Sequence, residues 1–112
     1  MIVIKLNTLE RLEEFQKDYN FLVIQFSASW CNPCRKITPE MIKWASRQKT
    51  KDVVYLYCDI NKEAGNKLVN VLDIEKIPSF LVVCNKTNTY SDMFYSNKKS
   101  EIVKFITKNV VF

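Results

Sequence analysis

The chain has 112 residues, of which 47% are hydrophobic, enough for a single globular domain over residues 1–112 with its own core. Its net charge of +5 comes from lysines and arginines scattered along the sequence, which is typical of a solvated surface and argues against a nucleic-acid partner. No apolar run reaches the roughly 18 residues of a membrane span, and no histidine is present to form a Cys/His catalytic pair or to bind zinc.

Strands and helices alternate in the predicted order of elements up to residue 84. Apolar stretches predict strands at 2–6, 21–28, 53–58 and 79–84, and apolar residues at helical spacing predict helices over about 8–18, 33–48 and 62–71. The stretch FLVIQFSA, at 21–28, is almost continuously apolar, which is typical of a strand buried on both faces of a sheet. Asn7, with Glu10 three residues later, has the pattern of a capping box and is the predicted cap of the first helix.

The last quarter of the chain predicts a hairpin followed by a helix. NKTN, at 85–88, predicts a turn, and the strand expected at 89–95 folds back on the strand before it. Asn97 is the predicted cap of the last helix. The order βαβαβαββα indicates an α/β fold with a central mixed sheet, in which three parallel-type strands are joined by an antiparallel C-terminal edge hairpin and flanked by four helices.

Two cysteines, Cys31 and Cys34, fall where the strand at 21–28 ends and the next helix begins. Such a pair can be half a zinc site, a structural disulfide or a redox dithiol. Cys31 lies at a helix N-terminus, which favours a thiolate nucleophile, and Cys34 lies one turn later on the same face, about 5 Å away and within disulfide range. Pro33 suits the first helical turn, and Trp30 offers an apolar surface beside the sulfur.

A zinc site would need Cys58 and Cys84 as its other two ligands. The strands that carry these two residues are expected on opposite sides of the strand at 21–28, too far apart to share a metal or a disulfide. We therefore expect no metal, and we expect Cys58 and Cys84 to be inert thiols in or near the core.

Two segments closely resemble the thioredoxin family. FSASWCNPCRKITPE, at 26–40, is similar to the family's active-site segment, usually Trp-Cys-Gly-Pro-Cys-Lys followed by a proline, here Pro39. EKIPSFLVV, at 75–83, is similar to the segment in which the family has a cis proline facing the dithiol, here Pro78. The order of elements also matches over residues 2–110, so the resemblance implies a thioredoxin fold for nearly the whole chain.

The resemblance implies a thiol-disulfide oxidoreductase that needs no metal or organic cofactor. Cys31 would attack a disulfide in a protein substrate, and Cys34 would resolve the mixed disulfide. The residues expected to contact the substrate are Trp30, Asn32, Pro33, Ile77 and Pro78. Reduction is the expected direction because Asn-Pro resembles the family's Gly-Pro, with electrons supplied by a reductase or another dithiol. The alternatives are a more oxidising isomerase or oxidase, and a protein-binding module that keeps only the fold.

The chain departs from the family at several positions. Gln25 stands where the family usually has a buried aspartate that manages the proton of the resolving cysteine, so we predict a slower resolving step and a different route for that proton. A buried Gln25 also needs hydrogen-bond partners. Gly65 is the only glycine, and asparagines such as Asn88 stand at turn positions where they tolerate positive φ. Ser96 adds a side chain near the substrate groove, which would narrow the range of substrates.

The start of the chain, MIVIKLNTLE, has a short apolar patch and no basic leader. It is therefore interpreted as a first strand and not as a signal peptide. We expect a cytoplasmic protein without a membrane partner, and we expect it to be a monomer.

Overall fold

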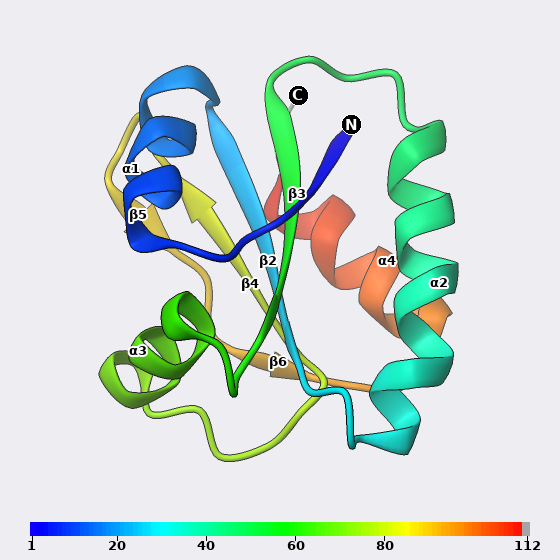
Figure 1. The fold of residues 1–112 in the computed structure, drawn as a ribbon. Coiled ribbons are helices and arrows are strands. Elements are labelled where there is room, and N and C mark those ends of the chain that lie inside the picture. The colour runs from blue at the N-terminus through cyan, green and yellow to red at the C-terminus, as the bar shows by residue number, and fades with distance from the viewer. Residues whose placement is uncertain (111–112) are drawn as a thin grey trace.

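The computed structural model describes residues 1–110 and has an α/β fold built on one mixed sheet (Figure 1). Its elements are β1 (Ile2–Lys5), α1 (Leu9–Asp18), β2 (Phe21–Ser27), α2 (Asn32–Arg47), β3 (Val53–Asp59), α3 (Glu63–Leu72), β4 (Ser79–Cys84), β5 (Thr89–Tyr90), β6 (Phe94–Tyr95) and α4 (Lys99–Asn109). The sheet order is β1-β3-β2-β4-β5, and β6 also pairs with β4. Strands β1, β3 and β2 are parallel, whereas β4 and its partners are antiparallel, so the predicted fold class is confirmed.

The sheet separates two cores. Helices α2 and α4 cover one face and α1 and α3 cover the other (Figure 1). Residues 22–26 of the central strand β2 are all buried because both of its faces are covered, which explains the nearly continuous apolar run in this segment. Val23 belongs to the core under α2 and α4, and Leu22 belongs to the core under α1 and α3. The sheet thus holds the carboxyl end of β2 rigidly between two packed layers.

The predicted cap of α1 is wrong by one residue. Thr8, and not Asn7, is the N-cap, and its hydroxyl accepts a hydrogen bond from the backbone N–H of Arg11 at 3.4 Å. Both residue types cap helices well, so the local sequence does not decide between them. The backbone carbonyl of Asn7 instead accepts from the N–H of Ala64 in α3, a long-range contact that keeps Asn7 outside the helix.

The predicted cap of α4 is also wrong. The N-cap is Lys98, which has no side-chain cap bond, and Asn97 lies one residue before it. The hydroxyl of Ser96 accepts from the backbone N–H of Lys98 at 3.1 Å. A serine hydroxyl therefore pairs with an N–H at the start of α4, which is the role expected of the asparagine.

The predicted strand over residues 89–95 is two short strands separated by a bulge. Opposite the two residues Leu81 and Val82 of β4, the returning chain has the three residues 91–93, so one extra residue is inserted. The N–H of Val82 donates to the hydroxyl of Ser91 at 2.9 Å, where a regular ladder would offer a backbone carbonyl. The bulge follows a turn in which Asn88 has a positive φ of 54°, the conformation that its residue type tolerates.

Within residues 1–110, no helix combines the length and the apolar character needed to cross a membrane.

Candidate active site

The two cysteines of the Cys-x-x-Cys segment lie at the carboxyl end of β2, where α2 begins. Cys31 and Cys34 form a disulfide, with their Cα atoms 5.3 Å apart. Cys31 is the N-cap of α2, and its sulfur accepts the backbone N–H of Cys34 at 3.3 Å. Cys31 is 7% exposed and Cys34 is 1% exposed, so Cys31 is the more accessible of the two. A donor aimed at its sulfur stabilises negative charge there, as a nucleophilic thiolate requires.

The other residues expected at the site come from two distant segments. Trp30 is 65% exposed, and Asn32 and Pro33 are exposed on the first turn of α2. Ile77, from the segment before β4, packs against the cluster formed by Ala28 and the two cysteines. The Ile77–Pro78 peptide bond is cis, which confirms the prediction from the resemblance. The fold thus brings Ile77 to the dithiol across more than forty residues of sequence.

Tyr95 lies beside this segment and was missed by the sequence reasoning. It pairs with Ser79, the residue after Pro78, and is 47% exposed, with the ammonium of Lys76 placed 5.5 Å from its ring centroid. Ser96, which was expected to narrow the groove, is buried. Its N–H donates to the carbonyl of Pro78 at 3.4 Å. Tyr95 is therefore the residue that presents an exposed side chain next to Pro78.

Behind the dithiol, Gln25 is fully buried and its side chain is hydrogen-bonded at both ends. Its Oε1 accepts from the phenol of Tyr55 at 2.5 Å, and its Nε2 donates to the hydroxyl of Thr38 at 2.8 Å. The Thr38 hydroxyl in turn donates to the backbone carbonyl of Cys34 at 2.6 Å. Burial raises the pKa of the Tyr55 phenol well above its ordinary value. Sequence reasoning required partners for Gln25 but did not identify Thr38 or Tyr55.

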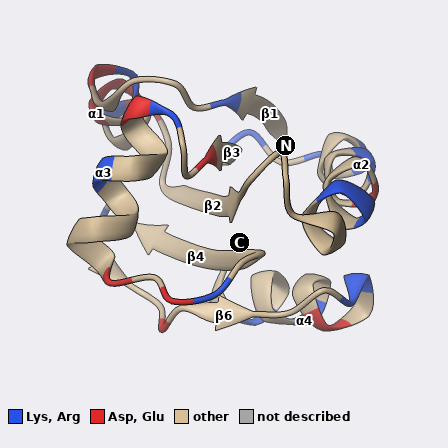
Figure 2. Cartoon of the chain, turned by 60° about the horizontal axis from the view of Figure 1, so that its bottom comes forward, with Lys and Arg blue, Asp and Glu red and all other residues tan. Residues whose placement is uncertain are grey.

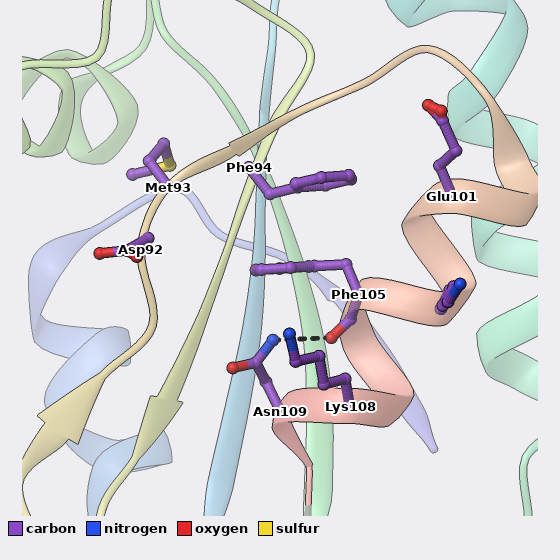
Figure 3. Close-up of a pocket in the computed structure, with 8 residues that line it drawn as sticks. Asp92, Met93, Phe94, Glu101, Phe105, Lys108 and Asn109 are labelled. Atoms are coloured by element: carbon purple, nitrogen blue, oxygen red, sulfur yellow. Dashed lines mark hydrogen bonds between the residues drawn. The ribbon is translucent and has the colours of Figure 1, made fainter.

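A cleft of about 330 Å³ reaches Cys34 from the side of β3. Its lining includes Cys34, Thr38, Tyr57, Cys58 and Asp59. A larger hollow of about 430 Å³ lies elsewhere, between residues 92–94 and α4, where the rings of Phe94 and Phe105 stack with centroids 4.7 Å apart (Figure 3). No cysteine lines the larger hollow, and the smaller cleft is lined by Cys34 but not by Cys31.

The remaining cysteines are free and differ from each other. Cys58 is buried, and burial, with the Asp59 carboxylate as a smaller cause, raises the pKa of its thiol to about 12. Cys84 lies half-buried at the end of β4 and belongs to none of the core clusters, so it lies near the core and not in it. Hydrogen bonds from Thr87 lower the pKa of the Cys84 thiol. In the described part of the chain, no three or more Cys, Asp or Glu residues gather as metal ligands.

A redox-capable dithiol at the start of a helix, in an α/β sheet with this order, defines a thiol-disulfide oxidoreductase type of site. The sequence profile of the thioredoxin family matches residues 3–108. The chain is 32% identical to thioredoxin H5 of Arabidopsis thaliana over 111 residues, which cover 96% of this chain and 89% of that protein. The chain therefore belongs to the thioredoxin family and carries its Cys-x-x-Cys pair.

The chain is also similar to part of some longer proteins. It is 30% identical over 92 residues to a protein disulfide-isomerase of Ricinus communis, a match that covers 80% of this chain and 18% of that protein. The chain thus spans less than a fifth of the length of such relatives. Among solved structures, a thioredoxin of Malassezia sympodialis superimposes with a TM-score of 0.80 at 20% identity, covering 96% of this chain and 93% of the other. At this identity the superposition supports the fold.

Proposed function

We propose that the protein is a protein-disulfide reductase. In this reaction the Cys31 thiolate attacks one sulfur of a substrate disulfide, a mixed disulfide forms, and the first substrate thiolate leaves and takes up a proton. The Cys34 thiolate then attacks the Cys31 sulfur, which releases the second substrate thiol and leaves Cys31 and Cys34 oxidised. The observation that carries the proposal is the N–H of Cys34 aimed at the Cys31 sulfur in a pair that already reaches disulfide distance.

The substrate would bind over the exposed surface around Cys31. The residues proposed to frame it are Trp30, Asn32, Pro33, Ile77 and Pro78. The exposure of Trp30 supports this role, since a large aromatic side chain that is 65% exposed offers contact area and contributes little to the core. Ile77 supports it as well, because it packs against the cluster formed by Ala28 and the two cysteines.

The proposed partners are protein disulfides and, as electron donor, a reductase or another dithiol. We propose that the chain acts as one domain and a monomer in the cytoplasm, without metal or organic cofactor. Basic and acidic residues both lie on the helices, and basic residues are in excess on α2 (Figure 2). Because the basic residues are scattered over several elements and form no single stripe, we propose no nucleic-acid or membrane partner.

The second candidate is an isomerase, which the similarity to the protein disulfide-isomerase of Ricinus communis favours. The reduction potential of the Cys31–Cys34 pair separates the two functions. The protein is equilibrated in graded thiol buffers, its free thiols are trapped by alkylation, and they are counted by mass. A value near about −270 mV supports a reductase, and a value toward roughly −180 mV supports an isomerase. If the Cys31–Cys34 pair never changes between disulfide and dithiol over the buffer series, both enzyme functions fail and a protein-binding module is the remaining candidate.

A further inference from the structure

A buried chain of hydrogen bonds joins the middle of the sheet to the backbone of Cys34. It begins at Tyr55 on β3, passes through Gln25 on β2 and Thr38 on α2, and ends at the carbonyl of Cys34. Tyr55 and Gln25 are fully buried, so both are held by the packed strands between the two cores. No buried side-chain nitrogen or oxygen in residues 1–110 lacks a partner, so this chain is complete.

Every donor in the chain points toward Cys34. The phenol donates to the Gln25 carbonyl oxygen, the Gln25 amide donates to the Thr38 oxygen, and the Thr38 hydroxyl donates to the Cys34 carbonyl. Hydrogen bonds aligned in one direction polarise one another and strengthen each bond. A hydroxyl has a single proton, so the donation from Gln25 leaves the Thr38 proton free for Cys34. The amide thus sets the direction of the last bond.

The peptide groups of Cys34 are held on both sides. Its N–H donates to the sulfur of Cys31 at 3.3 Å, and its carbonyl accepts from Thr38 at 2.6 Å. The first bond depends on the state of Cys31, because that sulfur bonds to substrate during turnover. The second bond does not involve any reacting atom. It can therefore keep Cys34 in place while the Cys31 sulfur is occupied.

We propose that Thr38, oriented by Gln25 and Tyr55, is a positioning residue that holds Cys34 for its attack on the mixed disulfide. This inference rests on the proposed function. Attack within a molecule depends steeply on placement of the reacting atoms, and a small displacement lowers the rate strongly. Gln25 and Tyr55 are held rigidly in the sheet, and the hydrogen bonds from them through Thr38 fix the position of Cys34 in the first turn of α2. The attack by Cys31 on a substrate does not need this device.

The test separates the two chemical steps. Reduced protein carrying Cys84→Ser, which removes the half-buried third thiol, is mixed in stopped flow with one equivalent of Ellman's reagent. The first release of thionitrobenzoate reports attack by Cys31 and depends on reagent concentration. The second release reports attack by Cys34 within the same molecule and is independent of concentration. Each rate is measured for the parent and for variants of the hydrogen-bond chain.

Thr38→Val is expected to slow the second release roughly tenfold, the effect of about one hydrogen bond, and to leave the first unchanged. Thr38→Ser keeps the hydroxyl and should restore the second rate. Thr107→Val is the matched control, since the Thr107 hydroxyl makes a similar bond to the carbonyl of Val103 at 2.9 Å on the exposed side of α4. It should change neither rate. Tyr55→Phe leaves Thr38 intact and should slow the second release less than Thr38→Val does. It replaces Thr38→Val as the test variant if Thr38→Val does not fold.

The inference is overturned if the second release is unchanged in both Thr38→Val and Tyr55→Phe. It is also overturned if Thr38→Val slows both releases equally, because a general loosening of the site would do that. A parent protein that releases only one thionitrobenzoate per molecule would overturn the proposed function itself, and this result is visible before any variant is made.

Discussion

The backbone N–H of Cys34 lies 3.3 Å from the Sγ of Cys31 and donates to it, so the two cysteines are joined by a hydrogen bond as well as by their disulfide. The bond gives them unequal environments. The Cys31 sulfur faces a donor at a helix N-terminus and is the more exposed, whereas Cys34 is 1% exposed and its backbone is tied to Thr38. This asymmetry predicts different roles for two chemically identical side chains.

Replacement of Cys34 by Ser should therefore trap a mixed disulfide on Cys31. Attack by Cys31 remains possible, but no thiol is left to resolve the product. With Cys84→Ser present both in this variant and in Cys31→Ser, intact-mass measurement after mixing Cys34→Ser with a disulfide substrate should show the protein plus one substrate thiol. Cys31→Ser should show no adduct at Cys34 on the same time scale. An adduct that forms equally in both variants would contradict the assignment of Cys31 as nucleophile.

Gln25→Asp should accelerate the resolving step. The substitution removes the amide donor to Thr38, which costs roughly tenfold in positioning, but it places a carboxylate where a base can accept the Cys34 proton. General base catalysis typically contributes about 10² to 10⁴, so the gain exceeds the loss. The second thionitrobenzoate release in stopped flow measures the effect. A rate equal to or below that of the parent would show that the proton of Cys34 does not limit resolution.

Tyr95→Ala should weaken binding of protein substrates without affecting the thiols. Tyr95 presents its ring beside Pro78, with Lys76 over it, so truncation removes aromatic contact area next to the proposed substrate position. We expect KM for insulin reduction to rise about fivefold, equivalent to about 1 kcal/mol of contact, with an unchanged rate toward Ellman's reagent. Tyr90→Ala is the control, because Tyr90 is 69% exposed and pairs with Val83 at the other end of β4. Equal effects of both variants would exclude a specific role for Tyr95.

The free thiols should differ in their reaction with iodoacetamide. In the oxidised protein, Cys84 should be modified first, because hydrogen bonds with Thr87 lower its pKa and the reactive thiolate therefore forms at a lower pH. The pKa of Cys58 is about 12, so at pH 8 only about one molecule in ten thousand carries that thiolate. Raising the pH toward 12 should bring Cys58 into reaction if the fold persists. Peptide mapping of alkylated protein at several pH values checks the order, and earlier labelling of Cys58 would contradict it.

The features predicted correctly from the sequence depend on contiguous segments. The order of elements up to residue 84 follows from periodicity, and the position of Cys31 and Cys34 at a helix start follows from a short motif. The cis bond before Pro78 follows from the resemblance to the thioredoxin family. The Thr8 cap of α1 was missed because the two adjacent residues, Asn7 and Thr8, are both of types that cap helices, and a distant contact of the Asn7 carbonyl decides between them.

The features that were missed depend on register between elements. Thr38 meets Gln25 because α2 packs across β2, and Tyr55 meets the same amide from the neighbouring strand. From the sequence alone, Thr38 could equally be a surface threonine and Tyr55 an ordinary aromatic residue of the core. The bulge at 91–93 was missed for the same kind of reason. A serine hydroxyl there replaces a backbone carbonyl as hydrogen-bond acceptor, and this replacement does not change the hydrophobic periodicity of the sequence. Sequence reasoning established that Gln25 needed partners, and only the packing identified them.

The only glycine of the chain, Gly65, lies where α3 packs closely against the backbone at the end of β3. It is buried in the first turn of α3, where a Cβ atom would collide with the carbonyl oxygen of Asp59 and lie 2.7 Å from its carbonyl carbon. Alanine would favour the helix by about 1 kcal/mol in an open position, but backbone atoms cannot move aside as a flexible side chain would. We expect Gly65→Ala to lower the free energy of unfolding by about 2 kcal/mol, measured by denaturant titration. Asn66→Ala, at the exposed next position of α3, should be neutral or stabilising, and a Gly65→Ala variant as stable as the parent would show that the Asp59 turn relaxes at no cost.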